Sequence, residues 1–333
     1  MKQLLVTGGA GFIGANFCRY VITHQPEVQI VVLDKLTYAG NRDNLAGLPA
    51  NRFRLIVGDI LDSELVDKLV AESDTVIHFA AESHNDRSLQ IPKEFVQTNI
   101  VGTVNLLEAC RKYQTRFHHV STDEVYGDLP IAEESAKFRE EDAYRPSSPY
   151  AATKASADLL VRAWCRSYGL QATISNSSNN FGPYQHVEKF IPRQITNILC
   201  DLPVKIYGAG DNVRDWLHVE DHAAAIWRIL EAGEIGETYL VGVDNPQDNL
   251  SIGKMILQFM GKSVDNVQFI ADRPGHDQRY ALDATKLSTL GWRPQKLDFE
   301  TALRETIYWY QSHKSWWQAA KRSIEKEYLD WEK

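Results

Sequence analysis

Short apolar runs alternate with amphipathic stretches through the first half of the chain. Most neighbouring runs are separated by a stretch in which apolar residues recur at helical spacing. Strands that alternate with helices form a parallel sheet covered on both faces. The pattern therefore predicts an α/β fold with a doubly wound parallel sheet, whose strands lie at residues 3–7, 29–33, 53–57, 75–79, 117–121 and 171–176.

The regular alternation ends beyond residue 180. Loops and short helices follow, with turn residues at 182–183, 201–203 and 208–211. This change predicts a smaller C-terminal substrate-binding lobe around the edge of the sheet. We expect a first domain at residues 1–180 and the lobe at residues 181–333, with the chain able to cross back between them.

A glycine-rich turn joins the first predicted strand to the first helix. Its glycines are Gly8, Gly11 and Gly14. The first would make the tight turn, the second would let backbone approach a pyrophosphate, and the third would let helix and strand pack closely. Unpaired amides at the helix N-terminus would face the anion. A lone glycine pattern is often an ordinary turn, but this strand and helix context predicts a dinucleotide site.

An acidic residue follows the second predicted strand. Asp34 can accept hydrogen bonds from ribose hydroxyls and would repel a 2′-phosphate, which favours NAD over NADP, although Lys35 beside it weakens the preference. Ligands of such sheets gather at the carboxyl ends of the strands. We therefore expect residues 59–60, 80–83 and 121–122 to line the cofactor crevice.

Composition limits the class of protein. The chain has 333 residues, 44% hydrophobic and 24% charged, which is enough for a large core, and its net charge of −8 argues against a general nucleic-acid binder. No apolar stretch approaches the roughly 18 residues that span a bilayer, and the start lacks a signal-peptide core, so we expect a cytoplasmic protein. The cysteines are too widely spaced for a metal cluster or a disulfide framework, and no metal is expected.

Two nearby segments supply groups for acid, base and redox chemistry. Thr122 offers a hydroxyl, Asp123 and Glu124 an acid pair, and Tyr150 and Lys154 share one face of a predicted helix. A lysine cation beside a phenol can lower the pKa of the phenol, and two carboxyls in opposing environments can work as acid and base. Taken singly, the tyrosine and lysine spacing could arise by chance, and the acid pair could lie in a solvated surface loop. Together, at the strand ends of a dinucleotide fold, they predict redox chemistry combined with loss of water.

These segments resemble the extended short-chain dehydrogenase/reductases, and among them the dTDP-glucose 4,6-dehydratases. The resemblance runs almost end to end, so a Rossmann-like fold is implied. It departs at Asn85, where a valine is expected, and at Ser177, where a cysteine is usual. Besides the segments already named, the matching stretches are Asp34 to Asn41, Ala80 to His84, Phe95 to Asn99, Ser121 to Gly127, Ser178 to Pro183, Val213 to Trp216 and Arg273 to Asp277.

The resemblance implies a mechanism. Tyr150 would take the proton of the sugar 4-hydroxyl, which Thr122 orients, while NAD takes hydride from C4 and Lys154 holds the nicotinamide ribose. Glu124 would then remove the C5 proton and Asp123 would protonate the departing C6 hydroxyl, before hydride returns to C6. The product would be dTDP-4-keto-6-deoxyglucose. The residues alone leave open which carboxyl is the acid, and the resemblance favours Asp123.

The resemblance also implies the binding residues. Besides Tyr150 and Lys154, those for the cofactor are Gly8, Gly11, Phe12, Ile13, Gly14, Asp34, Lys35, Leu36, Thr37, Asp59, Ile60, Phe79, Ala80, Ala81, Ser83, Thr98 and Asn180. Those for the nucleotide sugar are Ser83, Thr122, Asn179, Lys189, Phe190, Lys205, Ile206, Tyr207, Arg214, Asn249, Arg273 and His276. An alternative for Arg214 is an ion pair with Asp211 or Asp215.

Other functions remain open. Thymine and uracil differ by one methyl group, so UDP-glucose is an alternative substrate. A nucleotide-sugar 4-epimerase would use the same tyrosine, lysine and NAD, but has no need of the acid pair. A uronate decarboxylase would need a cation in place of Asp123, and an NAD-binding regulator would need none of the catalytic groups. We also expect a homodimer paired through the helices near residues 92–112 and 149–168, by analogy with the family.

Overall fold

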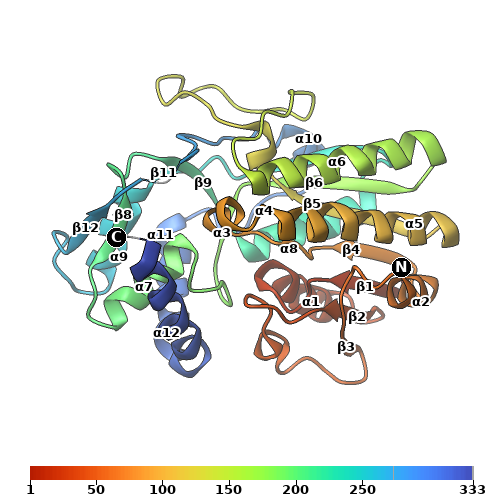
Figure 1. Ribbon diagram of the computed structural model, residues 1–333, viewed down its shortest axis with the longest axis horizontal. Helices are drawn as coiled ribbons and strands as arrows, with labels where there is room; N and C mark the ends of the chain where they lie inside the picture. Colours follow the sequence, from red (N-terminus) through yellow and green to blue (C-terminus); the bar gives the residue numbers. More distant parts are fainter. Residues whose placement is uncertain (273, 332–333) are drawn as a thin grey trace.

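The computed structural model describes residues 1–272 and 274–331, and its centre is a seven-stranded sheet (Figure 1). Neighbouring strands are all parallel, which confirms the predicted fold class. All six predicted strands are present. In spatial order the strands are β10 (Thr238–Val241), β6 (Ala172–Ser177), β5 (Arg116–Thr122), β4 (Thr75–His78), β1 (Gln3–Thr7), β2 (Gln29–Asp34) and β3 (Phe53–Val57).

Helices cover both faces of this sheet. On one face α1 (Phe12–His24) packs beside α8 (Val219–Ala232), and on the other lie α2 (Ser63–Ala71), α5 (Thr103–Tyr113) and α6 (Pro149–Tyr168). The strands are apolar on both sides because each face is buried against a helix layer. The order of the strands reverses between β1 and β4, where a doubly wound sheet opens a crevice.

The last strand of the sheet comes from the second half of the chain. After residues 178–218, which lie in the lobe, α8 and β10 return, and β10 pairs with β6 from Thr238 to Val241. The sequence predicted the possibility of a return but not this strand. Its place in the sheet depends on pairing with β6, which lies about 60 residues earlier in the chain, and a local pattern does not show such a contact.

The lobe has its own core of buried aliphatic and aromatic residues, among them Phe181, Tyr310 and Trp317. It lies beside the carboxyl ends of the sheet strands, on the left of Figure 1. Its helices are α7 (Phe190–Leu199), α9 (Asn249–Phe259), α11 (Phe299–Ser312) and α12 (Lys314–Trp331). Its strands are β7 (Asn179–Phe181), β9 (Val213–His218) and β11 (Pro246–Asp248) in one sheet, and β8 (Val204–Tyr207) and β12 (Val267–Ile270) in another.

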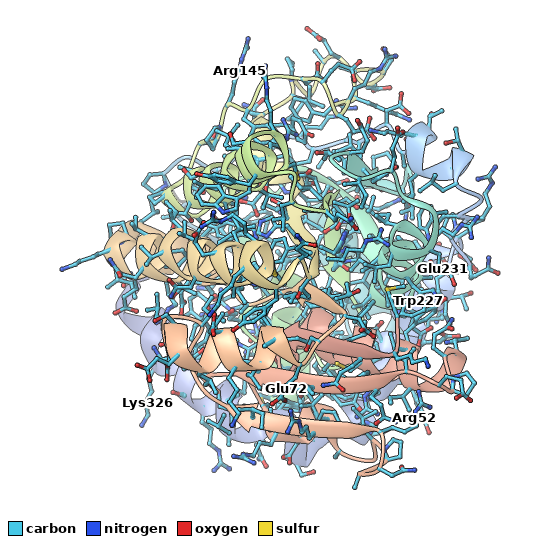
Figure 2. All side chains as sticks on the ribbon, turned by 90° about the vertical axis from the view of Figure 1, so that its right-hand side faces the viewer. Arg52, Glu72, Arg145, Trp227, Glu231 and Lys326 are labelled. Atoms are coloured by element: carbon cyan, nitrogen blue, oxygen red, sulfur yellow. The ribbon has the colours of Figure 1, made fainter. Side chains whose placement is uncertain are left out.

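Short helical turns and a long loop complete the chain. The acidic segment between residues 128 and 148 forms a loop at the top of Figure 1, and Figure 2 shows Arg145 at this edge of the molecule.

On α8, Trp227 donates to Glu231 at 2.8 Å, and Figure 2 shows the two side by side. The short elements are η1 (Arg42–Leu45), α3 (Asn85–Gln90), α4 (Pro92–Phe95), the π-helical η2 (Val96–Gly102), η3 (Asp123–Tyr126) and α10 (Thr285–Thr289).

Among the residues that the structure describes, no helix is both long and apolar enough to cross a membrane. Within the same residues, no group of histidine, cysteine and acidic side chains could hold a metal ion.

Candidate active site

A cleft of about 310 Å³ opens at the carboxyl ends of the sheet strands, where the strand order reverses. Every residue predicted to bind the cofactor lines this cleft except Leu36. The Leu36 side chain packs against the core beneath α1, and its backbone N–H donates to Asp34 at 2.8 Å. Leu36 therefore shapes the site through its backbone.

The glycine turn fits a dinucleotide closely. Gly8 has a φ of +69°, and a Cβ there would lie 2.5 Å from the backbone of Ala80. A Cβ at Gly14 would lie 2.4 Å from the carbonyl oxygen of Gly8. At the start of α1, Gly11 provides no side-chain cap, so the first amides of a 13-residue helix remain available to a pyrophosphate.

Asp34 is held rigidly at the end of β2. Its side chain is buried and accepts hydrogen bonds from the amides of Ala10 at 2.9 Å and Leu36 at 2.8 Å. Burial raises the pKa of this carboxyl, which the two amide bonds oppose. Lys35 pairs with Asp59 at 2.7 Å, so its cation is already engaged. Each oxygen of Asp34 keeps a lone pair for a ribose hydroxyl, as an NAD site requires.

The five predicted catalytic residues all line the same cleft. Thr122 ends β5, Asp123 and Glu124 form the turn η3, and Tyr150 and Lys154 lie in the first two turns of α6. This helix begins at a defined place because Ser148 caps it by accepting from the amide of Ala151 at 3.1 Å, followed by Pro149 at its first position.

Asp123 has the environment of a neutral acid. Its side chain is 1% exposed; Oδ1 accepts from Thr122 Oγ1 at 3.2 Å, and Oδ2 has no hydrogen-bond partner among the described residues. Burial raises the pKa of Asp123 well above its ordinary value, and the charge of Glu124 raises it further, against a smaller opposing effect of Arg214. A carboxyl that keeps its proton in this way can serve as a general acid.

Glu124 has a partner that the sequence analysis did not anticipate. Asn85 Nδ2 donates to Glu124 Oε2 at 2.9 Å, and Asn85 Oδ1 accepts from Ser148 Oγ at 2.9 Å. The only sequence signal for this contact was that asparagine stands where the resemblance leads to valine.

In this arrangement the pKa of Tyr150 is raised, whereas the sequence analysis expects Lys154 to lower it. Burial raises the pKa of Tyr150 well above its ordinary value, and the charges of Glu124 and Asp123 add to the effect. Lys154 Nζ instead donates to the carbonyl oxygen of Val120 at 2.8 Å. The helical spacing places the two side chains on one face, but it does not determine which acceptor the ammonium group of Lys154 bonds.

Behind Lys154 lies a buried polar network centred on Asp158. His119 Nε2 is 3.3 Å from Lys154 Nζ and 3.2 Å from Asp158 Oδ1. Asp158 Oδ2 accepts hydrogen bonds from Ser121 Oγ at 3.0 Å, Tyr144 Oη at 3.0 Å and Asn176 Nδ2 at 2.9 Å.

Charge and burial oppose each other in this network. Burial acts to raise the pKa of Asp158, but its hydrogen bond to His119 and the charges of His119 and Lys154 hold that pKa below its ordinary value. Burial also lowers the pKa of Lys154 to about 8, against the raising effect of Asp158. The sequence analysis missed Asp158, although its position four residues after Lys154 places both on one helix face.

The predicted substrate residues fall into two groups. Ser83, Thr122, Asn179 and Lys189 line the cleft. Lys189 Nζ donates to the carbonyl oxygen of Ser83 at 2.8 Å, and Asn179 Oδ1 is buried without a hydrogen-bond partner among the described residues. These groups can meet the polar part of a ligand.

The other predicted substrate residues that the structure describes do not line this cleft. Ile206 is fully buried in the core of the lobe, so only its backbone can reach a ligand. Arg273 lies outside the described residues. The remaining members of this group are Phe190, Lys205, Tyr207, Arg214, Asn249 and His276.

Arg214 is built into the lobe near the acid pair. Its guanidinium donates to the carbonyl oxygens of Val213, Asp277 and Gln278 at 2.7–3.2 Å and stacks on Tyr280 at 4.4 Å. Its described bonds thus go to backbone rather than to the two aspartates considered from sequence.

Known proteins resemble nearly the whole chain. The family model for GDP-mannose 4,6 dehydratase matches residues 5–306. The dTDP-glucose 4,6-dehydratase of Mycolicibacterium smegmatis is 56% identical over 329 residues, which cover 98% of this chain and 99% of that relative. The dTDP-glucose 4,6-dehydratase 1 of Escherichia coli K12 is 46% identical and covers 94% of each chain.

Solved structures share the architecture. The dTDP-glucose 4,6-dehydratase of Streptomyces venezuelae, solved with NAD bound, has a TM-score of 0.92 at 43% identity and covers 96% of this chain and 99% of its own. The UDP-glucose 4-epimerase of Thermus thermophilus, in complex with NAD, has a TM-score of 0.85 at 30% identity and covers 93% and 99%. Because one fold serves both activities, the side chains of the site must distinguish them.

We predict that Asp158→Ala lowers the free energy of unfolding by about 3 to 5 kcal/mol, because it removes a buried acceptor and leaves its donors without a partner. Urea unfolding followed by circular dichroism measures the change. Asp67→Ala is the control, since Asp67 also accepts several hydrogen bonds but on the exposed surface of α2, and it should cost little. Equal losses in the two variants would contradict the structural importance of the network.

Proposed function

Since the chain belongs to the nucleotide-sugar 4,6-dehydratases of the extended short-chain dehydrogenase/reductase family, we propose that it converts dTDP-glucose to dTDP-4-keto-6-deoxyglucose and water. The observation that carries this function is the pair of adjacent carboxyls in opposite environments. Asp123 is buried and favours its neutral form, whereas Glu124 accepts a hydrogen bond from Asn85. Both lie in a cleft that fits NAD.

The first step oxidises C4 of the sugar to a ketone by removing the C4 hydrogen as hydride and the proton of the 4-hydroxyl. NAD, when bound, would accept hydride from C4 and later return it to C6, while the proton held by Glu124 returns to C5. Thr122 orients the 4-hydroxyl and Tyr150 takes its proton. Because burial raises the pKa of Tyr150, this transfer needs a cation nearby, and Lys154 supplies one when its ammonium turns from Val120 toward the phenol and the ribose.

The second step eliminates water across C5 and C6. The ketone at C4 makes the C5 proton acidic, and Glu124 removes it as general base. The electron pair of the broken C5–H bond forms the C5–C6 double bond, and the C6–O bond breaks as Asp123 protonates the departing hydroxyl. Asp123 can give a proton because its raised pKa keeps it protonated.

The nucleotide is assigned from the relatives and from charge. Lys189 and Asn179 line the cleft and can meet the diphosphate or the sugar. Thymine and uracil differ by one methyl group, worth only about 1 to 3 kcal/mol in an apolar pocket, so UDP-glucose is the nearest alternative. A 4-epimerase has no use for the acid pair, which makes it the weaker candidate.

The two parts of the chain would have different binding roles. Residues 1–180, completed by α8 and β10, would bind NAD and carry the catalytic groups, while residues 181–333 would mainly hold the nucleotide sugar. All four cysteines are free thiols, as in a reducing compartment, which supports a cytoplasmic location that cell fractionation can check.

A homodimer would pair the helices α4 to α5 and α6 of two copies. Val96 is 41% exposed, Val101 38% and Leu159 55%, so these helices present apolar side chains to the outside. Sedimentation at micromolar concentration should give twice the chain mass, and a monomer alone would contradict the pairing.

Incubation with dTDP-glucose and, in parallel, UDP-glucose tests the function. We expect dTDP-glucose to lose the mass of one water and to give the alkaline absorbance of a 4-keto-6-deoxy sugar. Loss of water from UDP-glucose alone would keep the mechanism and change the nucleotide. Unchanged mass with both would reject the proposed reaction.

We predict that Tyr150→Phe slows the first hydride transfer by about 10²- to 10⁴-fold, because it removes the phenol that is proposed to take the 4-hydroxyl proton. Absorbance of reduced cofactor in a single turnover measures this step. Tyr239→Phe is the control, since Tyr239 is a buried tyrosine on β10 that does not line the cleft. Near-normal oxidation of C4 by Tyr150→Phe would show that another group is the base.

We predict that Asp123→Asn still oxidises C4 but loses water about 100-fold more slowly. Only protonated Asp123 can act, and its pKa is raised, so the wild-type elimination rate should hold at lower pH and fall as pH rises through that raised pKa. An amide does not ionise, so this alkaline decline should be absent in the variant. Equal loss of oxidation and elimination would instead indicate a structural role.

A further inference from the structure

Asn85 joins the side chain of Glu124 to the start of α6. The single planar amide uses both of its ends: Nδ2 donates to Glu124 Oε2 at 2.9 Å, and Oδ1 accepts from Ser148 Oγ at 2.9 Å. The partners fix its orientation, because an ionised carboxylate can only accept and therefore faces the NH₂ group. Valine, which the family resemblance leads us to expect here, could form neither bond.

Ser148 and Asn85 each lie at the start of a helix and make a further hydrogen bond within it. Ser148 accepts from the amide of Ala151 at 3.1 Å and so caps the helix that carries Tyr150 two residues later. Asn85 is the first residue of α3, and its backbone carbonyl oxygen accepts from Ser88 Oγ at 2.6 Å. The base proposed for C5 is thus linked through one side chain to the helix that carries the base proposed for the 4-hydroxyl.

The surroundings of Glu124 leave one of its two carboxylate oxygens accessible to a substrate. On the Asn85 side lies a cavity of only about 10 Å³, bounded also by Ser148, Gly275 and Tyr280, with room for no more than a water molecule. On the other side Glu124 borders the large cleft. Because Oε2 is held by Asn85 and Oε1 makes none of the hydrogen bonds that the structure describes, Oε1 is the oxygen available to a substrate.

We propose that Asn85 is a positioning residue for the elimination step. Its amide holds Glu124 with Oε1 toward the C5 proton and keeps that oxygen at a constant spacing from Tyr150. Small errors in the placement of a catalytic group are costly, so this link should affect elimination more than oxidation. The inference rests on the proposed function.

Two substitutions separate the possible roles. Asn85→Asp keeps the size of the side chain and an acceptor for Ser148, but replaces the donor that faces Glu124 with a carboxylate. Asn85→Val removes both bonds at similar volume. Asn105→Val is the matched control, because Asn105 is also a partly buried asparagine but donates to the backbone of Ile60 and Leu61, away from Glu124.

Each protein, purified as the full chain with NAD, is mixed with dTDP-glucose in deuterated water for a single turnover. Formation of reduced cofactor reports C4 oxidation, and deuterium uptake at C5 with loss of water reports elimination. We expect both Asn85 variants to slow elimination about tenfold, the scale of a hydrogen bond to a charged group, with oxidation and KM changed less than about twofold. Asn105→Val should not separate the two rates.

Equal slowing of oxidation and elimination in both Asn85 variants would overturn the inference, and so would unchanged rates. If Asn85→Val fails to fold, Asn85→Asp decides the question, with its thermal midpoint measured alongside. If the wild-type protein forms reduced cofactor but loses no water, the dehydratase function itself fails and the role of Asn85 falls with it.

Discussion

The carboxylate of Asp158 joins four segments of the chain, and the active site depends on that junction. From its place on α6 it accepts hydrogen bonds from β5, β6 and the long loop through Ser121, Asn176 and Tyr144. A buried charge is stable only when donors surround it, so these segments must come together for the helix to settle. Tyr150 and Lys154 then face the end of β5 at a defined distance.

Within this structure the site gives two neighbouring carboxyl groups different environments. Asp123 and Glu124 are neighbours in sequence, yet one is enclosed with an oxygen that has no described partner and the other is held by an amide. Repulsion between them pushes the proton onto the more buried carboxyl. Adjacent residues can thereby supply an acid and a base, which would give a fold shared with 4-epimerases a second reaction.

The sequence was sufficient for features that depend on local pattern. The six strands follow from periodicity, and the glycine turn, Asp34 and the five predicted catalytic residues, which follow from turn chemistry or resemblance, all line the cleft. Features that depend on which distant groups meet were missed. The pairing of β10 with β6, the link from Asn85 to Glu124 and the choice of Val120 by Lys154 are decided by tertiary packing. For the same reason Ile206 points into a core rather than toward a ligand.

The return of the chain to the sheet also governs how the protein can be made. Until β10 arrives, β6 is an open edge with unpaired backbone groups, the kind of edge that recruits other chains. During synthesis that edge stays exposed while residues 178–237 are translated, and only the emergence of residue 241 from the ribosome allows it to close. The first part of the lobe, residues 178–218, is therefore held between two segments of the chain that belong to the sheet and its helix layers.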